Sequence, residues 1–169
     1  MLTVVSDTHS RDGHRLRGRT LKAVRSAEVV LHVGDFMTES VLDAFEAEAD
    51  TLRGVYGNND DSGIRDRLPN ARTVEYEGIR FAMTHTVRGG TTALSLFGKQ
   101  READAVIVGH SHRPTADLTG ELPLLNPGSH AQPRGNRPGH MELEPVAGGL
   151  QGRLVTPDGE VFETFELTA

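Results

Sequence analysis

Short apolar runs alternate with amphipathic segments in the first third of the chain. Residues 2–6, 28–33 and 51–56 are rich in the β-branched and aliphatic side chains that favour strands. Between them, residues 14–27 have apolar positions at helical spacing, and a second helix is expected at 39–49 after a cap at Thr38. The order strand, helix, strand, helix, strand predicts a parallel sheet covered by helices.

The rest of the chain has shorter apolar runs separated by turn residues. We expect strands at 72–76, 79–83, 105–108, 114–118 and 122–125. Glu77-Gly78 predicts a hairpin turn, and Thr92 is a candidate cap for a short helix through Lys99. We expect residues 130–139 to be irregular and the remainder to form two or three antiparallel strands ending near Leu167.

Composition is that of an ordinary globular protein. The 169 residues are 36% hydrophobic and 25% charged, which fits one domain spanning 1–169. The sequence has no apolar run of the roughly 20 residues needed to cross a bilayer and no secretory signal pattern, so we expect a cytoplasmic protein. It has no cysteine, which excludes disulfides and thiolate metal sites.

The charge balance narrows the class of partner. The formal net charge is −6, which disfavours electrostatic binding along a nucleic acid. It still permits a small phosphorylated substrate whose charge is met locally by bound metal. We therefore expect a small phosphodiester or phosphorylated substrate, no membrane partner and no long nucleic acid, with a homo-oligomer left open.

Residue types that ligate metals follow five of the predicted strands. They are Asp7, His9, Asp35, Asn58, His85, His110 and His112. The carboxyl ends of strands in α/β sheets are where sites assemble, so we expect these side chains to converge. Seven nitrogen and oxygen ligands exceed the needs of one tetrahedral metal and suit two ions. Asp35 is the natural bridge, because each carboxylate oxygen can bind one ion.

Such a pair of ions has a defined chemistry. Two divalent cations about 3.5–4 Å apart can activate a water molecule and neutralise phosphate oxygens during in-line attack. Taken singly, Asp35 reads as a turn residue and His85 as an ordinary surface or core histidine; only the ordered set supports the hypothesis. His14 and His140 lie outside every motif and are expected to be solvated.

In order and spacing, these motifs resemble those of the calcineurin-like metallophosphoesterases. The matching stretches are Asp7-Thr8-His9, Gly34-Asp35, Gly57-Asn58-Asn59-Asp60, Thr84-His85 and Gly109-His110-Ser111-His112. Ser6 and the segment Asn126-Pro127-Gly128-Ser129 resemble the small prokaryotic phosphodiesterase branch. The resemblance extends from residue 2 to about residue 134. It implies a four-layer α-β-β-α sandwich with two mixed sheets and a dinuclear site on one rim.

The resemblance also implies roles for individual residues. Asp7, His9 and His112 would hold one ion, and Asn58, His85 and His110 the other, with Asp35 between them. Asp35 and Asn59 are the implied catalytic residues. Manganese is the first expectation by analogy with the family, and zinc, iron and nickel are compatible because such ligands discriminate poorly among these metals.

Two positions depart from the family pattern. Where many members have a histidine that assists the leaving group, this chain has Asn59, which cannot act as a general acid near neutral pH. This difference disfavours an efficient monoesterase acting on alkoxide leaving groups. Where His-Gly-His is common, this chain has His85-Thr86-Val87, which alters the substrate side of the pocket.

These observations favour a dinuclear metal-dependent phosphoesterase, with a phosphodiesterase as the first hypothesis. Two alternatives remain open. The fold also serves as a protein-interaction scaffold in a retromer subunit whose ligands are degraded, whereas all seven positions are filled here. A nucleotide phosphatase or nuclease would use the same site.

Overall fold

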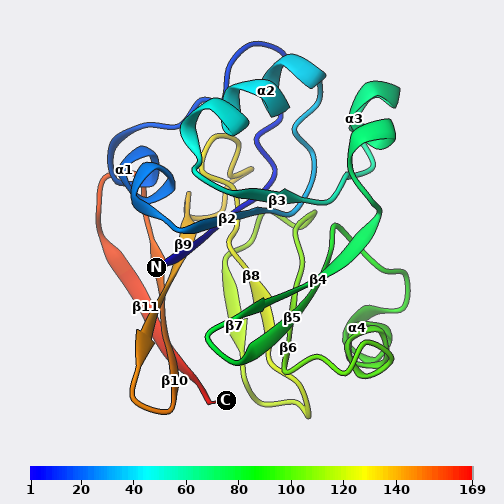
Figure 1. Ribbon diagram of the computed structural model, residues 1–169, viewed down its shortest axis with the longest axis vertical. Coiled ribbons are helices and arrows are strands. Elements are labelled where there is room, and N and C mark those ends of the chain that lie inside the picture. Colours follow the sequence, from blue (N-terminus) through cyan, green and yellow to red (C-terminus); the bar gives the residue numbers. More distant parts are fainter. Residues whose placement is uncertain (169) are drawn as a thin grey trace.

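Two β-sheets pack face to face in the computed structural model, which describes residues 1–168 (Figure 1). The first sheet has the order β11 (Val161–Thr168), β10 (Gly149–Val155), β9 (His140–Val146), β1 (Leu2–Val5), β2 (Val29–His32) and β3 (Leu52–Gly54). The second has the order β4 (Ala71–Tyr76), β5 (Ile79–Thr84), β6 (Ala105–Ile107), β8 (Leu124–Asn126) and β7 (Thr115–Asp117).

Both sheets are mixed, and each contains a parallel centre. β1, β2 and β3 are parallel, as the alternation of strands and helices predicts, and β9 joins β1 in the antiparallel sense. In the second sheet β5, β6 and β8 are parallel, with β4 and β7 antiparallel at the edges. The carboxyl ends of the parallel strands carry the loops that hold the candidate ligands.

The main core lies between the two sheets. Leu2 and Val4 of β1 point into it and are fully buried against residues of the second sheet such as Phe81. Thr3 and Val5 point the other way, toward the helices, because side chains alternate along a strand.

Helices cover the outer faces, which gives the four layers expected for the fold. α1 (Gly18–Ser26) and α2 (Glu39–Glu48) lie over the first sheet, and α4 (Gly90–Lys99) lies beside the second (Figure 1). α2 buries Val41, Leu42 and Phe45, as its sequence pattern predicts. Within residues 1–168, no helix has the length and apolar character to cross a membrane.

Three helix predictions need correction. Residues 62–67 form a helix, α3 (Ser62–Arg67), which the apolar pattern does not reveal because only Ile64 is buried. α1 begins at Gly18 instead of residue 14. α4 begins at Gly90 instead of after Thr92, because Gly89 adopts a left-handed φ of 111° and occupies the N-cap position.

His140 and His14 are not solvated, contrary to expectation. His140 is fully buried on the helix-facing side of β9, with its Nδ1 3.0 Å from Thr20 Oγ1 and its Nε2 3.0 Å from Glu142 Oε1. Arg19 of α1 donates two hydrogen bonds to the same Glu142 carboxylate, at 2.6 and 2.7 Å. His14 is half-buried, with its Nε2 3.3 Å from Glu48 Oε1. Glu48 is distant from His14 in sequence, whereas Glu142 lies two residues after His140 on the same face of β9.

Truncation in the inter-sheet core should destabilise the protein strongly. Leu31 of β2 is fully buried there, so we expect Leu31→Ala to lower the free energy of unfolding by about 2–5 kcal/mol, from lost burial and the cavity left behind. The same substitution at Leu96, which is 55% exposed, should change it by less than about 0.5 kcal/mol. Urea denaturation measures both values, and equal effects would contradict the proposed core.

Glu142 should make stability depend on acid pH. Burial alone would raise its pKa, but hydrogen bonds from His140 and Arg19 outweigh burial and lower the pKa to about 2. A depressed folded-state pKa stabilises the protein above the unfolded-state value, and this contribution is lost as pH falls from about 4.5 toward 2. We expect Glu142→Gln to lower the free energy of unfolding at pH 6 and to flatten its decline between pH 6 and pH 3. Glu163→Gln, at an exposed position on β11, should leave the slope unchanged.

Candidate metal centre

The loops that follow five strands meet at one edge of the two sheets. Asp7 and His9 follow β1, Asp35 follows β2, and Asn58 follows β3 in the first sheet. From the second sheet, His85 follows β5, and His110 and His112 follow β6. Each predicted ligand therefore approaches the same region from the carboxyl end of a strand, as the sequence pattern predicts.

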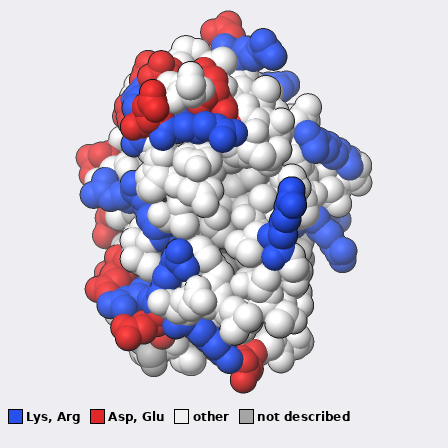
Figure 2. Space-filling view, turned by 90° about the vertical axis from the view of Figure 1, so that its right-hand side faces the viewer, with Lys and Arg blue, Asp and Glu red and all other residues white. Residues whose placement is uncertain are grey.

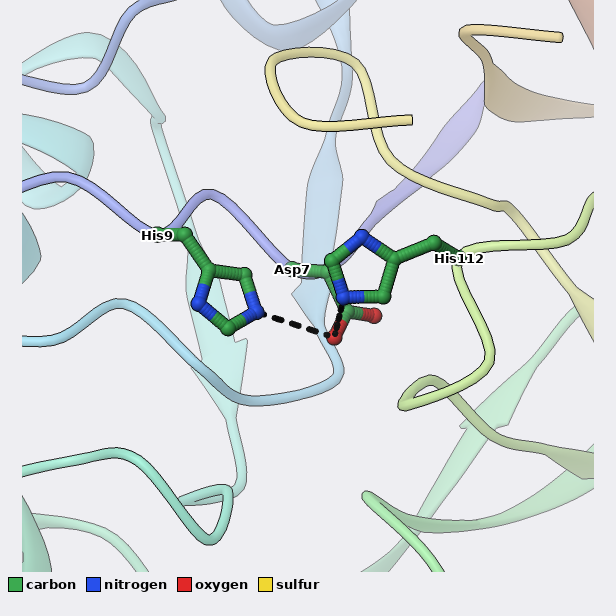
Figure 3. A group of neighbouring side chains, drawn as sticks. All are labelled: Asp7, His9 and His112. Carbon is green, nitrogen blue, oxygen red and sulfur yellow. Dashed lines mark ion pairs between the residues drawn. The ribbon is translucent and has the colours of Figure 1, made fainter. Parts of the chain in front are cut away.

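Five of the seven side chains form a tight inner group. His112 Nε2 lies 3.3 Å from Asp7 Oδ1, and His9 Nε2 lies 3.6 Å from the same oxygen (Figure 3). Asp35 Oδ2 lies 3.2 Å from His9 Nε2 and 3.2 Å from His85 Nε2. The second carboxylate therefore stands midway between the two histidines.

Asn58 and His110 lie at the exposed side of this group. Their side chains contact each other, with Asn58 Oδ1 3.0 Å from His110 Nδ1. The His110 ring lies 5.3 Å from the His85 ring, centroid to centroid, and nearly perpendicular to it. The structure thus brings all seven predicted residues to one edge of the sheets, with five in the inner group and Asn58 and His110 on its exposed side.

Asn59 contacts the central carboxylate directly. Its backbone N–H donates to Asp35 Oδ1 at 2.8 Å, and its side-chain amide donates to Asp35 Oδ2 at 2.7 Å. Both oxygens of Asp35 are therefore held in place by one residue. Asn59 stands where many family members have a histidine, and in this chain it orients Asp35, the candidate bridging ligand.

Asp7 is held by its other oxygen and by its backbone. Oδ2 accepts hydrogen bonds from Ser6 Oγ at 2.6 Å and from the His110 backbone N–H at 3.0 Å. The backbone oxygen of Asp7 accepts from Ser129 Oγ at 2.7 Å. These contacts leave Oδ1 pointing into the inner group.

Two histidines are fixed in the orientation that metal ligation requires. His85 Nδ1 donates to the Val33 carbonyl at 2.7 Å, and His112 Nδ1 donates to the Gln132 carbonyl. A carbonyl oxygen can only accept, so Nδ1 carries the proton and the Nε2 of the neutral ring carries the lone pair. Histidine ligands in metal sites are commonly held this way.

The inner atoms fit a cation. Asp7 Oδ1, His9 Nε2 and His85 Nε2 are buried and have no hydrogen-bond partner among residues 1–168. Buried polar atoms are normally paired, because leaving one unsatisfied costs free energy. Three such atoms on three loops, converging within a few ångströms, are the donor set that a divalent ion would satisfy.

Electrostatics at the centre favour positive charge. Burial alone would lower the pKa of His9, but the carboxylates of Asp35 and Asp7 outweigh it and raise the pKa to about 9. Burial would likewise lower the pKa of His85, and Asp35 and Asp7 raise it. For Asp35, burial opposes ionisation, while His85 and His9 hold its pKa well below the usual range.

The backbone of these loops is unusual. Candidate ligands on three different loops adopt left-handed φ angles, namely Asp7 (54°), His9 (45°), Asp35 (60°), His110 (68°) and His112 (57°). Residues other than glycine rarely adopt this conformation, and it costs free energy. Gly57 makes the close approach of two loops possible, since a Cβ there would lie 2.1 Å from Asp35 Oδ1.

Asp60 anchors the loops without facing the inner group. Its carboxylate accepts from the backbone N–H groups of Gly57 at 2.7 Å, Met37 at 2.8 Å and Asp35 at 3.0 Å. Burial raises its pKa, although these N–H groups oppose the shift. Asp60 therefore ties the loop after β3 to the loop after β2.

The amino-acid sequence does not predict these supporting contacts. Asp60 is a ligand-type residue, but its role as an acceptor for backbone N–H groups depends on the distant residues Asp35 and Met37. Ser129 and the Gln132 carbonyl likewise act on partners far away in the sequence. Asp60 and Ser129 do lie inside quoted motif segments, which was the available signal. Gln132 lies in the irregular segment 130–139, where nothing in the sequence indicates which carbonyl faces a histidine.

Comparison with known proteins now adds to the geometry. A sequence model of the calcineurin-like phosphoesterase superfamily domain matches residues 1–146. The chain belongs to this superfamily. It is therefore a member of a family of metal-dependent phosphoesterases, and the candidate ligands described above lie within the matched region.

Individual relatives agree with this family. A probable metallophosphoesterase from Methanothermobacter thermautotrophicus is 34% identical over 148 residues, covering 85% of this chain and 84% of that protein. A phosphodiesterase from Methanocaldococcus jannaschii is 25% identical, covering 74% and 81%. The crystal structure of Vps29 from Entamoeba histolytica complexed with Zn²⁺ superposes with a TM-score of 0.81 at 22% identity, covering 99% of both chains. This last similarity shows the shared fold.

Removing the Asp60 carboxylate should loosen the centre of this metallophosphoesterase fold. Asp60→Ala leaves three backbone N–H groups without their acceptor, so we expect the free energy of unfolding to fall by about 2–4 kcal/mol. Metal retained after gel filtration should fall as well, because Asp35 loses its anchor. Urea denaturation of metal-free protein and metal analysis measure the two effects.

The neighbouring residue provides a matched control. Asp61 caps α3 by accepting from the Ile64 N–H at 3.0 Å and does not touch Asp35. We expect Asp61→Ala to cost about 1 kcal/mol and to leave metal content unchanged. Equal metal loss in both variants would show that Asp60 has no particular role in holding the site.

Proposed function

We propose that this protein is a dinuclear metal-dependent phosphodiesterase. The observation that carries the proposal is the convergence of three buried atoms without a hydrogen-bond partner, Asp7 Oδ1, His9 Nε2 and His85 Nε2. The Asp35 carboxylate lies beside both histidine atoms. In the proposed assignment Asp7, His9 and His112 hold one ion, and Asn58, His85 and His110 hold the other.

Asp35 is the proposed bridge between the two ions. Its Oδ2 lies at equal distances of 3.2 Å from His9 Nε2 and His85 Nε2, which belong to different ions in this assignment. The two hydrogen bonds from Asn59 fix the carboxylate plane. Manganese remains the first candidate by family analogy, with zinc, iron or nickel compatible with the same ligands.

The bound cations would supply an activated water nucleophile and neutralise phosphate oxygens. The chain itself holds the ligands in position. Hydrogen bonds from Ser6 and Asn59 fix the carboxylates of Asp7 and Asp35. Backbone carbonyls accept hydrogen bonds from His85 and His112 and fix their rings. Asn59 cannot donate a proton as an acid, so the leaving group departs best when it is already a stable anion. This favours activated diesters over alkyl monoesters.

The molecular surface favours a small substrate. On the face shown in Figure 2, the Lys and Arg side chains toward the right stand apart on uncharged surface, and those toward the left are interspersed with acidic groups. A long nucleic acid would need a continuous basic surface to bind well. With a net charge of −6, the proposed partner is a small phosphodiester or other small phosphorylated molecule.

A scaffold role is the second candidate. The fold is shared with Vps29 over 99% of both chains, so the same architecture occurs in a protein named for vacuolar sorting. Residues that can ligate a metal stand at all seven ligand positions, and this favours the enzyme over the scaffold. Metal binding without turnover of any diester, monoester or nucleotide would favour the scaffold.

Removal and restoration of metal test the proposal. Protein treated with excess chelator should lose hydrolysis of bis(p-nitrophenyl) phosphate, and adding back Mn²⁺, Zn²⁺, Fe²⁺ or Ni²⁺ should restore it with about two ions per chain. Unchanged hydrolysis in excess chelator would contradict the proposal.

A variant pair separates this chemistry from a contaminating activity. We expect Asp35→Asn to lower kcat/KM by more than about 100-fold, since even groups outside the ligand sphere are worth 10–100-fold. Asp66→Asn, at an exposed position on α3, should keep wild-type values. Equal activity of the two variants would place the hydrolysis elsewhere.

A further inference from the structure

A hollow in the surface adjoins the candidate metal centre. It measures about 280 Å³ and is lined by Tyr56, Gly57, Asn58, Arg65, Asn70, His85 and Thr86. His85 and Asn58 belong to the proposed ligand set, so a molecule bound at the metal centre would reach directly into this hollow. Its size is just below the range of about 300–1,000 Å³ typical of sites for drug-sized ligands, which suits a single ring system.

Two residues of the lining, Tyr56 and Arg65, form a cation–π contact. Arg65 Cζ lies 5.0 Å from the centroid of the Tyr56 ring, and Tyr56 packs against the core beneath the helices. The guanidinium is fixed at its edge, because Nε donates to the Asp60 carbonyl at 3.0 Å and Nη2 to the Asn58 carbonyl at 3.1 Å. The Arg65 guanidinium thus contacts the Tyr56 ring and two backbone carbonyls. Arg65 is otherwise exposed, so part of its guanidinium is accessible to a ligand.

The charge of Arg65 is unpaired. Among residues 1–168, salt bridges to Asp or Glu do not include Arg65, whereas Arg67 on the same helix has three acidic partners. An exposed, planar cation held over an aromatic ring binds other planar π systems well.

Two polar side chains that line the hollow, those of Asn70 and Thr86, make no hydrogen bond within residues 1–168. Asn70 uses its backbone carbonyl to accept from Thr84 Oγ1 at 3.2 Å, but its side-chain amide makes no hydrogen bond with the described chain. The Thr86 hydroxyl likewise has no partner there, and both residues are exposed. An amide and a hydroxyl can each donate and accept, so they can pair with the polar edge of a heteroaromatic ring.

We propose that this hollow, with Tyr56, Arg65, Asn70 and Thr86, is a nucleobase subsite for a nucleoside-bearing phosphoester whose phosphate lies at the metal centre. The inference rests on the proposed function for the position of the phosphate. The base would stack on Arg65, and Asn70 and Thr86 would meet its edge. The preferred substrate class is therefore a small nucleotide diester.

Ligand binding tests the subsite independently of turnover. Zinc-loaded full-length protein is titrated with adenosine 5′-monophosphate and with methyl phosphate, which share the phosphate and differ in the base, and ¹H–¹⁵N NMR follows the backbone amides. We expect adenosine 5′-monophosphate to have a dissociation constant about tenfold lower, the gain typical of one stacked base. Its additional shifts should include the amides of Asn70 and Thr86.

Variants of the wall identify where the base binds. Asn70→Ala and Thr86→Ala should each reduce the affinity ratio of the two ligands about threefold or more. Thr91→Ala, at an exposed position on α4 outside the lining of this hollow, is the matched control and should keep the wild-type ratio.

The outcomes separate the two proposals. Equal affinities for both ligands, or a ratio unchanged in both wall variants, would overturn the subsite while metal-dependent hydrolysis of bis(p-nitrophenyl) phosphate still supported the phosphodiesterase. Binding of neither phosphate, together with absent hydrolysis, would overturn both.

Discussion

Two buried carboxylates at the meeting edge of the sheets determine what this structure can do. Asp7 and Asp35 each direct one oxygen toward His9 and His85, and both carboxylate side chains are almost fully buried. Carboxylates held so close require positive charge between them. The Asp35 and Asp7 carboxylates accordingly raise the pKa of both His9 and His85 against the opposing effect of burial. A divalent cation would supply the same charge and would also bind their unpartnered atoms.

The two packed sheets hold the loops of the site in place, although the backbone conformation of these loops costs free energy. Left-handed backbone at residues such as His9 and Asp35 is unfavourable in isolation and persists only where surrounding contacts over-determine it. Those contacts come from rigid neighbours: Asp60 holds three backbone N–H groups, and Ser129 holds the Asp7 carbonyl. Behind them, strands buried on both faces fix where each loop begins. Stability of the core and geometry of the site are therefore coupled.

Sequence patterns predict those features that depend on local chemistry. The parallel pairing of β1, β2 and β3, the buried face of α2 and the convergence of seven ligand-type residues follow from apolar periodicity and from the rule that strand ends share an edge. Features set by distant partners could not be predicted. His140 reads as a surface residue until β9 is placed against α1, where Thr20 and Glu142 surround it. α3 is too short and too polar to show a periodicity, although Asp61 is an ordinary helix cap.

The pairing of β1 with β9 has a consequence for how the molecule is made. Asp7 and His9 follow β1 directly, yet the second neighbour of β1 in the sheet is formed by residues 140–146, and Asp7 itself contacts Ser129 and the backbone of His110. During synthesis, β1 leaves the ribosome well before β9, so the hydrogen bonds between these two strands form only after residues 140–146 have been made. Contacts of such long sequence separation slow folding. Until residues 140–146 are made, the nascent chain would therefore expose an unpaired edge of β1, and a chaperone that shields such edges would raise the yield of folded protein.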